Sequence, residues 1–242
     1  MRILIISDVH ANLTALEAVL ADAGLFDAVW CLGDLVGYGP DPNECVETIS
    51  NLPKLTCLVG NHDAAALGQI DLGAFNKDAS ISARWMQTTL TDACLRFLRN
   101  LPEQMEMNGT TLVHGSPRNP VWEYLLDPRT AAHNFEYFDT QVCLVGHTHL
   151  PVTFLLQEDG TTLDWRILGM GEEITITGRA ILNPGSVGQP RDHDPRAAYA
   201  IYDPDQLSWE LHRVQYDVLS VQKRIYDAGL PRRHALRLEE GW

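Results

Sequence analysis

Short apolar runs alternate with amphipathic stretches along the first 150 residues. The apolar runs are short enough to predict buried strands at 2–7, 28–32, 55–59, 110–113 and 142–145. The intervening apolar periodicity predicts helices near 12–23, 41–51 and 128–138, and a two-helix excursion over 75–100. Such alternation of strands with helices is typical of an α/β arrangement.

The pattern changes after Pro151 and becomes richer in strands. Runs at 152–157 and 161–167 flank Asp159-Gly160, which is a hairpin signature. Further strands are predicted at 172–177, 180–183, 197–202 and 207–214, and the chain closes with a helix near 217–228 and a polar tail. We therefore expect an α/β (α+β) fold in which two packed sheets carry helices on their outer faces.

No segment of the chain has the composition of a linker between domains. We expect one domain over 1–242, with strand–helix units in 1–150, a strand-rich half in 151–215, and a C-terminal helix and tail in 216–242.

Composition narrows the class of protein. A hydrophobic content of 45% and a charged content of 21% are ordinary for a soluble globular protein, and no apolar run approaches the ~20 residues that span a bilayer. The first strand starts almost at Met1, which leaves no room for a signal peptide.

The five cysteines are odd in number and irregularly spaced, and Cys31, Cys57 and Cys143 lie inside apolar runs. Reduced, buried thiols and a cytoplasmic location without membrane contact are therefore expected.

The formal net charge of −14 would repel a nucleic-acid backbone, so we expect no non-specific nucleic-acid binding. An anionic substrate would need a local positive source, which bound metal ions can supply. A monomer and a homodimer are both compatible with such a chain.

Residues of metal-ligand type follow each of the five apolar runs. They are Asp8-Val9-His10, Asp34, Asn61-His62-Asp63, His114 and His147-Thr148-His149. Open α/β sheets place their sites at the carboxyl ends of strands, so these side chains are expected to converge. On an extended chain Asp8 and His10 would project to one side, and the same holds for His147 and His149. Imidazole and carboxylate groups suit Zn, Mn, Fe and Ni better than Mg or Ca.

The charge of these groups favours a pair of ions. Asp34 stands alone between two glycines and suits a carboxylate that bridges two cations about 3.5–4 Å apart. Two divalent ions and the carboxylates of Asp8 and Asp34 leave a net charge of about +2, because the other candidates are neutral. Such a site would attract phosphate and acidify a bound water molecule.

Taken together, these motifs resemble those of the calcineurin-like metallophosphoesterase superfamily in order and spacing, from residue 8 to residue 149. The resemblance implies a four-layer α/β/β/α sandwich of two mixed sheets flanked by helices. It also implies two divalent transition-metal ions, of which Mn is the first expectation and Fe, Zn or Ni are alternatives. Carried over by motif, one ion would be held by Asp8, His10 and His149, the other by Asn61, His114 and His147, with Asp34 bridging.

The same resemblance implies a catalytic mechanism. A metal-bound hydroxide would attack phosphorus in line, and the ions would neutralise charge on the phosphate oxygens. His62 would contact phosphate or protonate the leaving oxygen, and Asp63 would orient His62.

The segments 114–124 and 183–191 resemble a group of small bacterial members that are loosely labelled phosphodiesterase-like or diadenosine-tetraphosphatase-like. The implied substrate is a small phosphomonoester, a phosphodiester or a dinucleotide polyphosphate. One alternative is a protein Ser/Thr phosphatase, but those relatives carry Asp-Arg-Gly where this chain has Gly37-Tyr38-Gly39. Another is an interaction scaffold that has lost metal-ligand histidines, whereas every expected ligand is present here. Nuclease relatives have more basic grooves than this acidic chain suggests.

Six residues outside the ligand set are candidates to bind substrate. Guanidinium groups match phosphate oxygens bidentately, which nominates Arg118, Arg191 and Arg196, with ion pairs to Glu123, Asp192 or Asp194 as the alternative. Tyr38, together with Trp122 and Tyr124, is a candidate to stack on an aryl or nucleoside group, or else closes the core. His133, His212 and His234, the last in a solvated Arg232-Arg233-His234 helix end, are expected to be incidental. His193 is expected in a solvent-exposed turn, with a metal or phosphate contact as the alternative.

Overall fold

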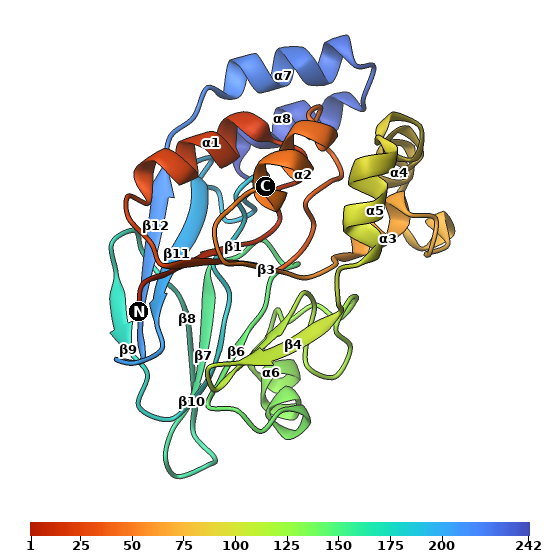
Figure 1. The fold of residues 1–242 in the computed structure, drawn as a ribbon. Helices are drawn as coiled ribbons and strands as arrows, with labels where there is room; N and C mark the ends of the chain where they lie inside the picture. The colour runs from red at the N-terminus through yellow and green to blue at the C-terminus, as the bar shows by residue number, and fades with distance from the viewer.

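Two six-stranded mixed sheets pack face to face in the computed structural model, which describes residues 1–242 (Figure 1). Sheet A has the order β3-β2-β1-β11-β12-β9 and sheet B the order β4-β5-β6-β10-β7-β8. The strands of sheet A are β1 (Ile3–Ile6), β2 (Ala28–Cys31), β3 (Leu55–Cys57), β9 (Glu173–Thr175), β11 (Ala197–Asp203) and β12 (Ser208–Val214). Those of sheet B are β4 (Gln104–Met107), β5 (Thr110–Val113), β6 (Val142–Leu144), β7 (Val152–Leu156), β8 (Leu163–Ile167) and β10 (Arg179–Leu182).

Five of the six parallel strands lie in residues 1–150, where strands were predicted to alternate with helices, and β10 lies in the strand-rich half. In sheet A, β1, β2 and β3 are mutually parallel. In sheet B, β5, β6 and β10 are parallel, and the remaining pairings in both sheets are antiparallel. The C-terminal ends of parallel neighbours share one edge of their sheet, so polar residues that follow these strands are brought together.

Helices cover the outer faces of both sheets, which confirms the expected α/β/β/α layering. The helices on the sheet A side are α1 (Leu13–Asp22), α2 (Pro42–Ser50), α4 (Lys77–Thr89) and α5 (Asp92–Arg99). On the sheet B side, α6 (Pro128–Asn134) and the 3₁₀ turn η2 (Phe135–Tyr137) pack on Val113 and Val145. Between the sheets lies an apolar core that includes Trp30, Tyr202 and Trp209, which are almost fully buried.

Besides the last helix of the chain, three elements were not expected from the sequence. Strand β4 is an edge strand with half-exposed residues, and α3 (Asn61–Ala66) is a short helix that begins directly at the Asn61 motif. A further 3₁₀ turn, η1 (Leu72–Ala74), precedes α4.

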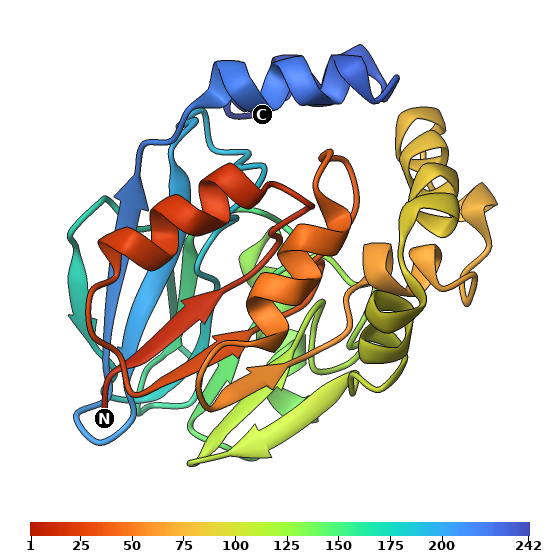
Figure 2. The same cartoon turned by 45° about the horizontal axis from the view of Figure 1, so that its top comes forward.

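The expected polar tail is wrong, because the chain ends in a second helix. Helices α7 (Val218–Asp227) and α8 (Arg232–Glu240) form an antiparallel pair whose facing residues include Val221, Ile225 and Leu238. Figure 2 shows this pair running across the top of the molecule, beyond α1 and α2. The segment is polar on average, yet its few apolar residues share one face and are buried by packing on α7.

All five cysteines are free and buried, as the sequence predicted. None of the helices is both long enough and apolar enough to cross a bilayer.

Candidate metal centre

The seven predicted ligands are buried and lie just beyond the C-terminal ends of five strands from both sheets. These residues are Asp8 and His10 after β1, Asp34 after β2, Asn61 after β3, His114 after β5, and His147 and His149 after β6. Their ligand atoms form overlapping groups within 4.8 Å: Asp8–His10–His149, His10–Asp34–His62 and Asp34–His114–His147. Asp34 belongs to two of the groups, so it stands between the clusters.

The distances between these atoms are those expected around a transition-metal ion. Two ligand atoms held about 2.1 Å from one ion, at angles of about 90–110°, lie roughly 3.0–3.5 Å apart. Here His149 Nε2 lies 3.3 Å from Asp8 Oδ1 and 3.0 Å from His10 Nε2. His114 Nε2 lies 3.3 Å from Asp34 Oδ2 and 3.2 Å from Asn61 Oδ1.

Three histidines donate from Nδ1 to a backbone carbonyl and direct Nε2 into the site. The Nδ1 atom of His10 donates to the Val36 carbonyl at 3.2 Å, that of His149 to Gln189 at 2.5 Å, and that of His114 to Leu32 at 2.9 Å. Burial lowers the pKa values of His10 and His149, so these rings are neutral and their Nε2 atoms carry no proton. His10 Nε2 and His149 Nε2 consequently face each other as two acceptors, an arrangement that a shared cation stabilises and a hydrogen bond cannot. The raised pKa of His114 leaves its Nε2 protonated until a cation binds.

Each of the two carboxylates has one oxygen that is bonded to the backbone and one that has no hydrogen-bond partner. One oxygen of Asp8 accepts from the backbone N–H of His147 at 3.0 Å, and one oxygen of Asp34 accepts from that of His62 at 2.8 Å. Their other oxygens, Asp8 Oδ1 and Asp34 Oδ2, are buried and have no hydrogen-bond partner, and neither has His147 Nε2. Unpaired buried acceptors are costly, so this donor set fits metal ions.

Backbone strain gathers at the same residues. The φ angles are 55° at Asp8, 49° at His10, 55° at Asp34, 64° at His147 and 61° at His149. A side chain in this left-handed region costs about 1–2 kcal/mol, and such outliers cluster at functional sites. The expectation that Asp8 and His10 alternate on an extended chain is therefore wrong, as it is for His147 and His149. Strands β1 and β6 end before these residues, and turns rather than pleats direct their side chains.

Glycine is required where backbone segments approach the carboxylates. A Cβ on Gly60 would lie 2.0 Å from Asp34 Oδ1, and one on Gly33 would lie 2.7 Å from the Gly60 nitrogen. The loops after β2 and β3 can therefore meet only without side chains at these positions.

Burial and neighbouring charges shift the proton affinities of these groups when no cation is bound. Burial raises the pKa of Asp8 to about 7 and lowers that of His147 to about 3. Burial also opposes protonation of His114, but the neighbouring Asp34 carboxylate outweighs it and raises the pKa of His114 to about 9. The imidazoles of His10 and His149 have pKa values well below the usual range, again because of burial. Neutral imidazole is the metal-binding form.

The predicted catalytic pair, His62 and Asp63, lies at the first turn of α3. Burial lowers the pKa of His62 to about 4, and its Nδ1 atom has no hydrogen-bond partner. The Asp63 carboxylate accepts from the backbone N–H groups of Val36 at 3.1 Å and Gly60 at 3.0 Å. Asp63 thus joins the loops after β2 and β3, on which Asp34 and His62 stand.

Aromatic rings surround the site. Tyr38 is buried and packs on the rings of His10 and His62, with centroids 4.5 and 4.4 Å apart. Tyr124 stacks on His147 at 3.8 Å and is 44% exposed, which leaves part of its ring open to solvent. The rings of Trp122 and Phe75 pack together with centroids 5.1 Å apart. Phe75 was not among the candidate site residues identified from the sequence.

The three nominated arginines occupy different environments. Arg191 donates to the Tyr38 hydroxyl at 3.3 Å, and its backbone N–H donates to the His149 carbonyl at 3.4 Å, so it lies beside the cluster. Arg118 forms an ion pair with Glu123, and Arg196 pairs with Asp194 at 2.6 Å.

Glu123 ties down the loop that follows His114. It accepts hydrogen bonds from Ser116 at 2.6 Å and from Asn134 at 2.9 Å, in addition to its ion pair with Arg118. Burial alone would raise the pKa of Glu123, but these hydrogen bonds outweigh it and lower that pKa to about 2.

One residue near the site was misread as incidental. His234 on α8 is buried, and its ring packs on that of Tyr38 with centroids 4.8 Å apart. In the sequence, His234 lies in a polar segment without a recognisable motif. Its contact with Tyr38 becomes visible only when α8 is seen packed in the structure.

An α/β/β/α sandwich with a buried His/Asp/Asn cluster at the strand ends defines the class of metal-dependent phosphoesterases. The calcineurin-like phosphoesterase superfamily domain matches residues 1–207, and the chain belongs to this family. A similar structure is that of a metallophosphoesterase from Sphaerobacter thermophilus, with 48% identity, a TM-score of 0.92, and coverage of 100% of this chain and 99% of that one.

Two archaeal proteins are also similar to the chain. An uncharacterized protein of Methanocaldococcus jannaschii is 40% identical over 238 residues, which cover 95% of this chain and 93% of that protein. A hypothetical protein of Pyrococcus horikoshii OT3 shares the fold, with 21% identity, a TM-score of 0.79, and coverage of 100% of this chain and 98% of that one.

Proposed function

We propose that this protein is a phosphoesterase with a pair of divalent metal ions, which hydrolyses a small phosphomonoester, phosphodiester or dinucleotide polyphosphate. Family membership supports the phosphoester chemistry. The observation that carries the metal dependence is the facing pair of Nε2 lone pairs on His10 and His149, beside the buried, unpaired oxygens Asp8 Oδ1 and Asp34 Oδ2.

The proposed ligands divide into two sets that share Asp34. Asp8, His10 and His149 would hold one ion, and Asn61, His114 and His147 would hold the other. Bound ions would polarise the phosphate oxygens and acidify a water molecule. Because the ligand set holds only two carboxylates, the loaded site would remain positive and attract phosphate despite the acidic chain.

His62 is proposed to act on the substrate rather than on an ion. Its backbone is fixed by Asp34, and its ring is held between Tyr38 and Phe75 with Nδ1 unpaired. A ring so placed can donate a hydrogen bond to a phosphate oxygen or a proton to the leaving oxygen. His62 also stands within 4.8 Å of ligand atoms of His10 and Asp34, so measuring the metal content of a His62 variant separates the two roles.

Arg191 is the proposed phosphate contact among the three nominated arginines, because it lies beside His149 and is not held by a carboxylate. Arg118 and Arg196 are candidates only if substrate competes with Glu123 and Asp194 for them. Mn is the first choice of ion, with Fe, Zn and Ni as alternatives. The buried free cysteines support a cytoplasmic location.

The test compares p-nitrophenyl phosphate with bis-p-nitrophenyl phosphate, using protein dialysed against chelator and then loaded with Mn²⁺, Ni²⁺ or Zn²⁺. We expect turnover of at least one ester that requires added metal and is inhibited by orthophosphate. Full metal loading without turnover of either ester would favour a binding scaffold over an enzyme.

A further inference from the structure

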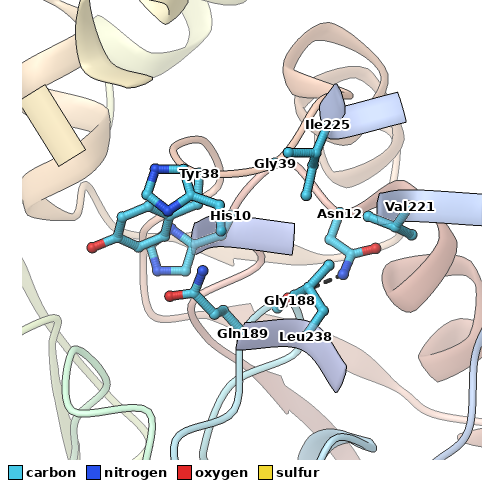
Figure 3. Close-up of a pocket in the computed structure, with 10 residues that line it drawn as sticks. His10, Asn12, Tyr38, Gly39, Gly188, Gln189, Val221, Ile225 and Leu238 are labelled. Carbon is cyan, nitrogen blue, oxygen red and sulfur yellow. Dashed lines mark hydrogen bonds between the residues drawn. The ribbon is translucent and has the colours of Figure 1, made fainter. Parts of the chain in front are cut away.

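The C-terminal helical pair lies outside the matched family domain yet reaches the metal centre. The domain match ends at residue 207, whereas α7 and α8 span 218–240. Figure 3 shows Leu238 of α8 and Ile225 of α7 directed toward a small cavity whose other walls include His10 and Tyr38. The helical pair therefore forms one wall of the region beside the ligands.

Contacts at both ends fix α8 in this position. His234, in its first turn, hydrogen-bonds Ser82 Oγ at 2.8 Å and packs on Tyr38. Just after its last turn, the Gly241 carbonyl accepts the backbone N–H of His193 at 2.7 Å. The second contact joins α8 to the loop that carries Arg191. Arg237 lies three residues after His234, on the same side of the helix.

Arg191 and Arg237 differ from the other buried or partly buried arginines near this wall. Ion pairs engage Arg196, Arg213 and Arg224, but none engages Arg191 or Arg237. The Nε atoms of both are buried and have no hydrogen-bond partner. The Arg191 guanidinium donates to the Tyr38 hydroxyl and to the neutral Gln189 side chain, each at 3.3 Å. The Arg237 guanidinium lies 5.5 Å from the centre of the Trp242 ring.

Both arginines lie next to Tyr38, since Arg191 donates to its hydroxyl and His234, one turn before Arg237, packs on its ring. Burial lowers the pKa of Arg237, and the charges of Arg191 and Arg233 lower it further. The carboxylate of Asp78 acts in the opposite direction but forms no ion pair with Arg237. An anion between the two guanidinium groups would relieve both their repulsion and their unpaired N–H groups.

We propose that Arg191 and Arg237 form a second anion subsite beside the metal centre, which binds the phosphate next to the one that is hydrolysed. The preferred substrates would then carry a diphosphate or longer polyphosphate group rather than a single phosphate. This inference rests on the proposed function, because it takes the metal centre as the place of hydrolysis. Arg237 acts as a specificity residue, since it lies outside the proposed ligands.

The test compares methylenediphosphonate with methylphosphonate, two ligands that cannot be hydrolysed, by calorimetric titration of the Mn²⁺-loaded full chain. We expect the diphosphonate to bind at least about tenfold more tightly. Arg237→Ala should remove most of that advantage and leave methylphosphonate affinity within about twofold, while Arg237→Lys should keep part of it. Arg233→Ala is the matched control, because Arg233 lies one turn earlier, is exposed and packs on the same Trp242 ring.

A second readout needs no metal. The diphosphonate should raise the melting temperature of the metal-free wild type and of Arg233→Ala, but not that of Arg237→Ala. The proposal is overturned if wild type binds both ligands equally, or if Arg233→Ala and Arg237→Ala weaken binding to the same extent. Failure of the proposed function would look different, because ester turnover and metal loading would be absent whatever the diphosphonate affinity.

Discussion

Replacing Asp34 by Asn removes one charge from the point where the two ligand clusters meet, while it conserves the size of the side chain. The amide oxygen can still accept the backbone N–H of His62, which now lies 2.8 Å from Asp34 Oδ1. Oδ2, which has no hydrogen-bond partner and lies 3.3 Å from His114 Nε2 and 3.7 Å from His10 Nε2, would become an amide group. The change therefore acts on both clusters at once.

The magnitude follows from the lost charge. At about 2.1 Å, a carboxylate charge and a divalent ion attract each other by about 4 kcal/mol even at the dielectric constant of water, and by more in a buried site. The neutral amide recovers part of this attraction. We therefore expect Asp34→Asn to bind each ion at least about 100-fold more weakly, which corresponds to about 2.7 kcal/mol, and to lose turnover.

The assay is metal titration of the chelator-treated protein, followed by calorimetry and by elemental analysis after gel filtration. Asp227→Asn is a matched control with the same change in net charge, because Asp227 is exposed and pairs only with Lys223 on the surface. Asp34→Asn protein that keeps two ions at wild-type affinity, with near-normal kcat, would refute the reasoning about the bridging carboxylate.

Three further predictions test separate parts of the account. His62→Ala should retain both ions but lower kcat by about 10²–10⁴-fold, most for esters with poor leaving groups; loss of an ion would instead make His62 a ligand. Gly60→Ala should lower metal occupancy and thermal stability, because the new Cβ would overlap Asp34 Oδ1; equal metal content and melting temperature would contradict the close approach. Glu123→Gln should destabilise the fold by about 1–3 kcal/mol at pH 7, as measured by urea denaturation. Because the folded-state pKa of Glu123 is depressed to about 2, its contribution is present above pH 4.5 and is lost as the pH falls toward 2. The difference between variant and wild type should therefore shrink below pH 4.5, and a difference independent of pH would argue against it.

The parallel-strand half of the fold was predictable because its strands are buried on both faces and read as continuous apolar runs. The candidate metal ligands that follow these strands could be identified for the same reason. The end of an apolar run can be recognised even when the conformation of the turn after it cannot. Edge strand β4 was missed because its residues alternate between exposed and half-buried, and short α3 because Asn61–Ala66 also carries the site motif.

Helix α8 could not be predicted, because its burial depends on α7 and on Tyr38, both distant in the sequence. For the same reason His234 was read as incidental. The positive φ angles at Asp8 and His147 were also missed, because Asp and His adopt left-handed φ more often than most residues but far less readily than glycine does.

Anomalous diffraction from crystals grown with Mn²⁺ tests the central claim most directly. The account predicts two peaks about 3.5–4 Å apart, with Asp34 Oδ2 between them and His114 and His149 on opposite sides. A single peak, or ions bound away from these side chains in a fully loaded protein, would contradict it.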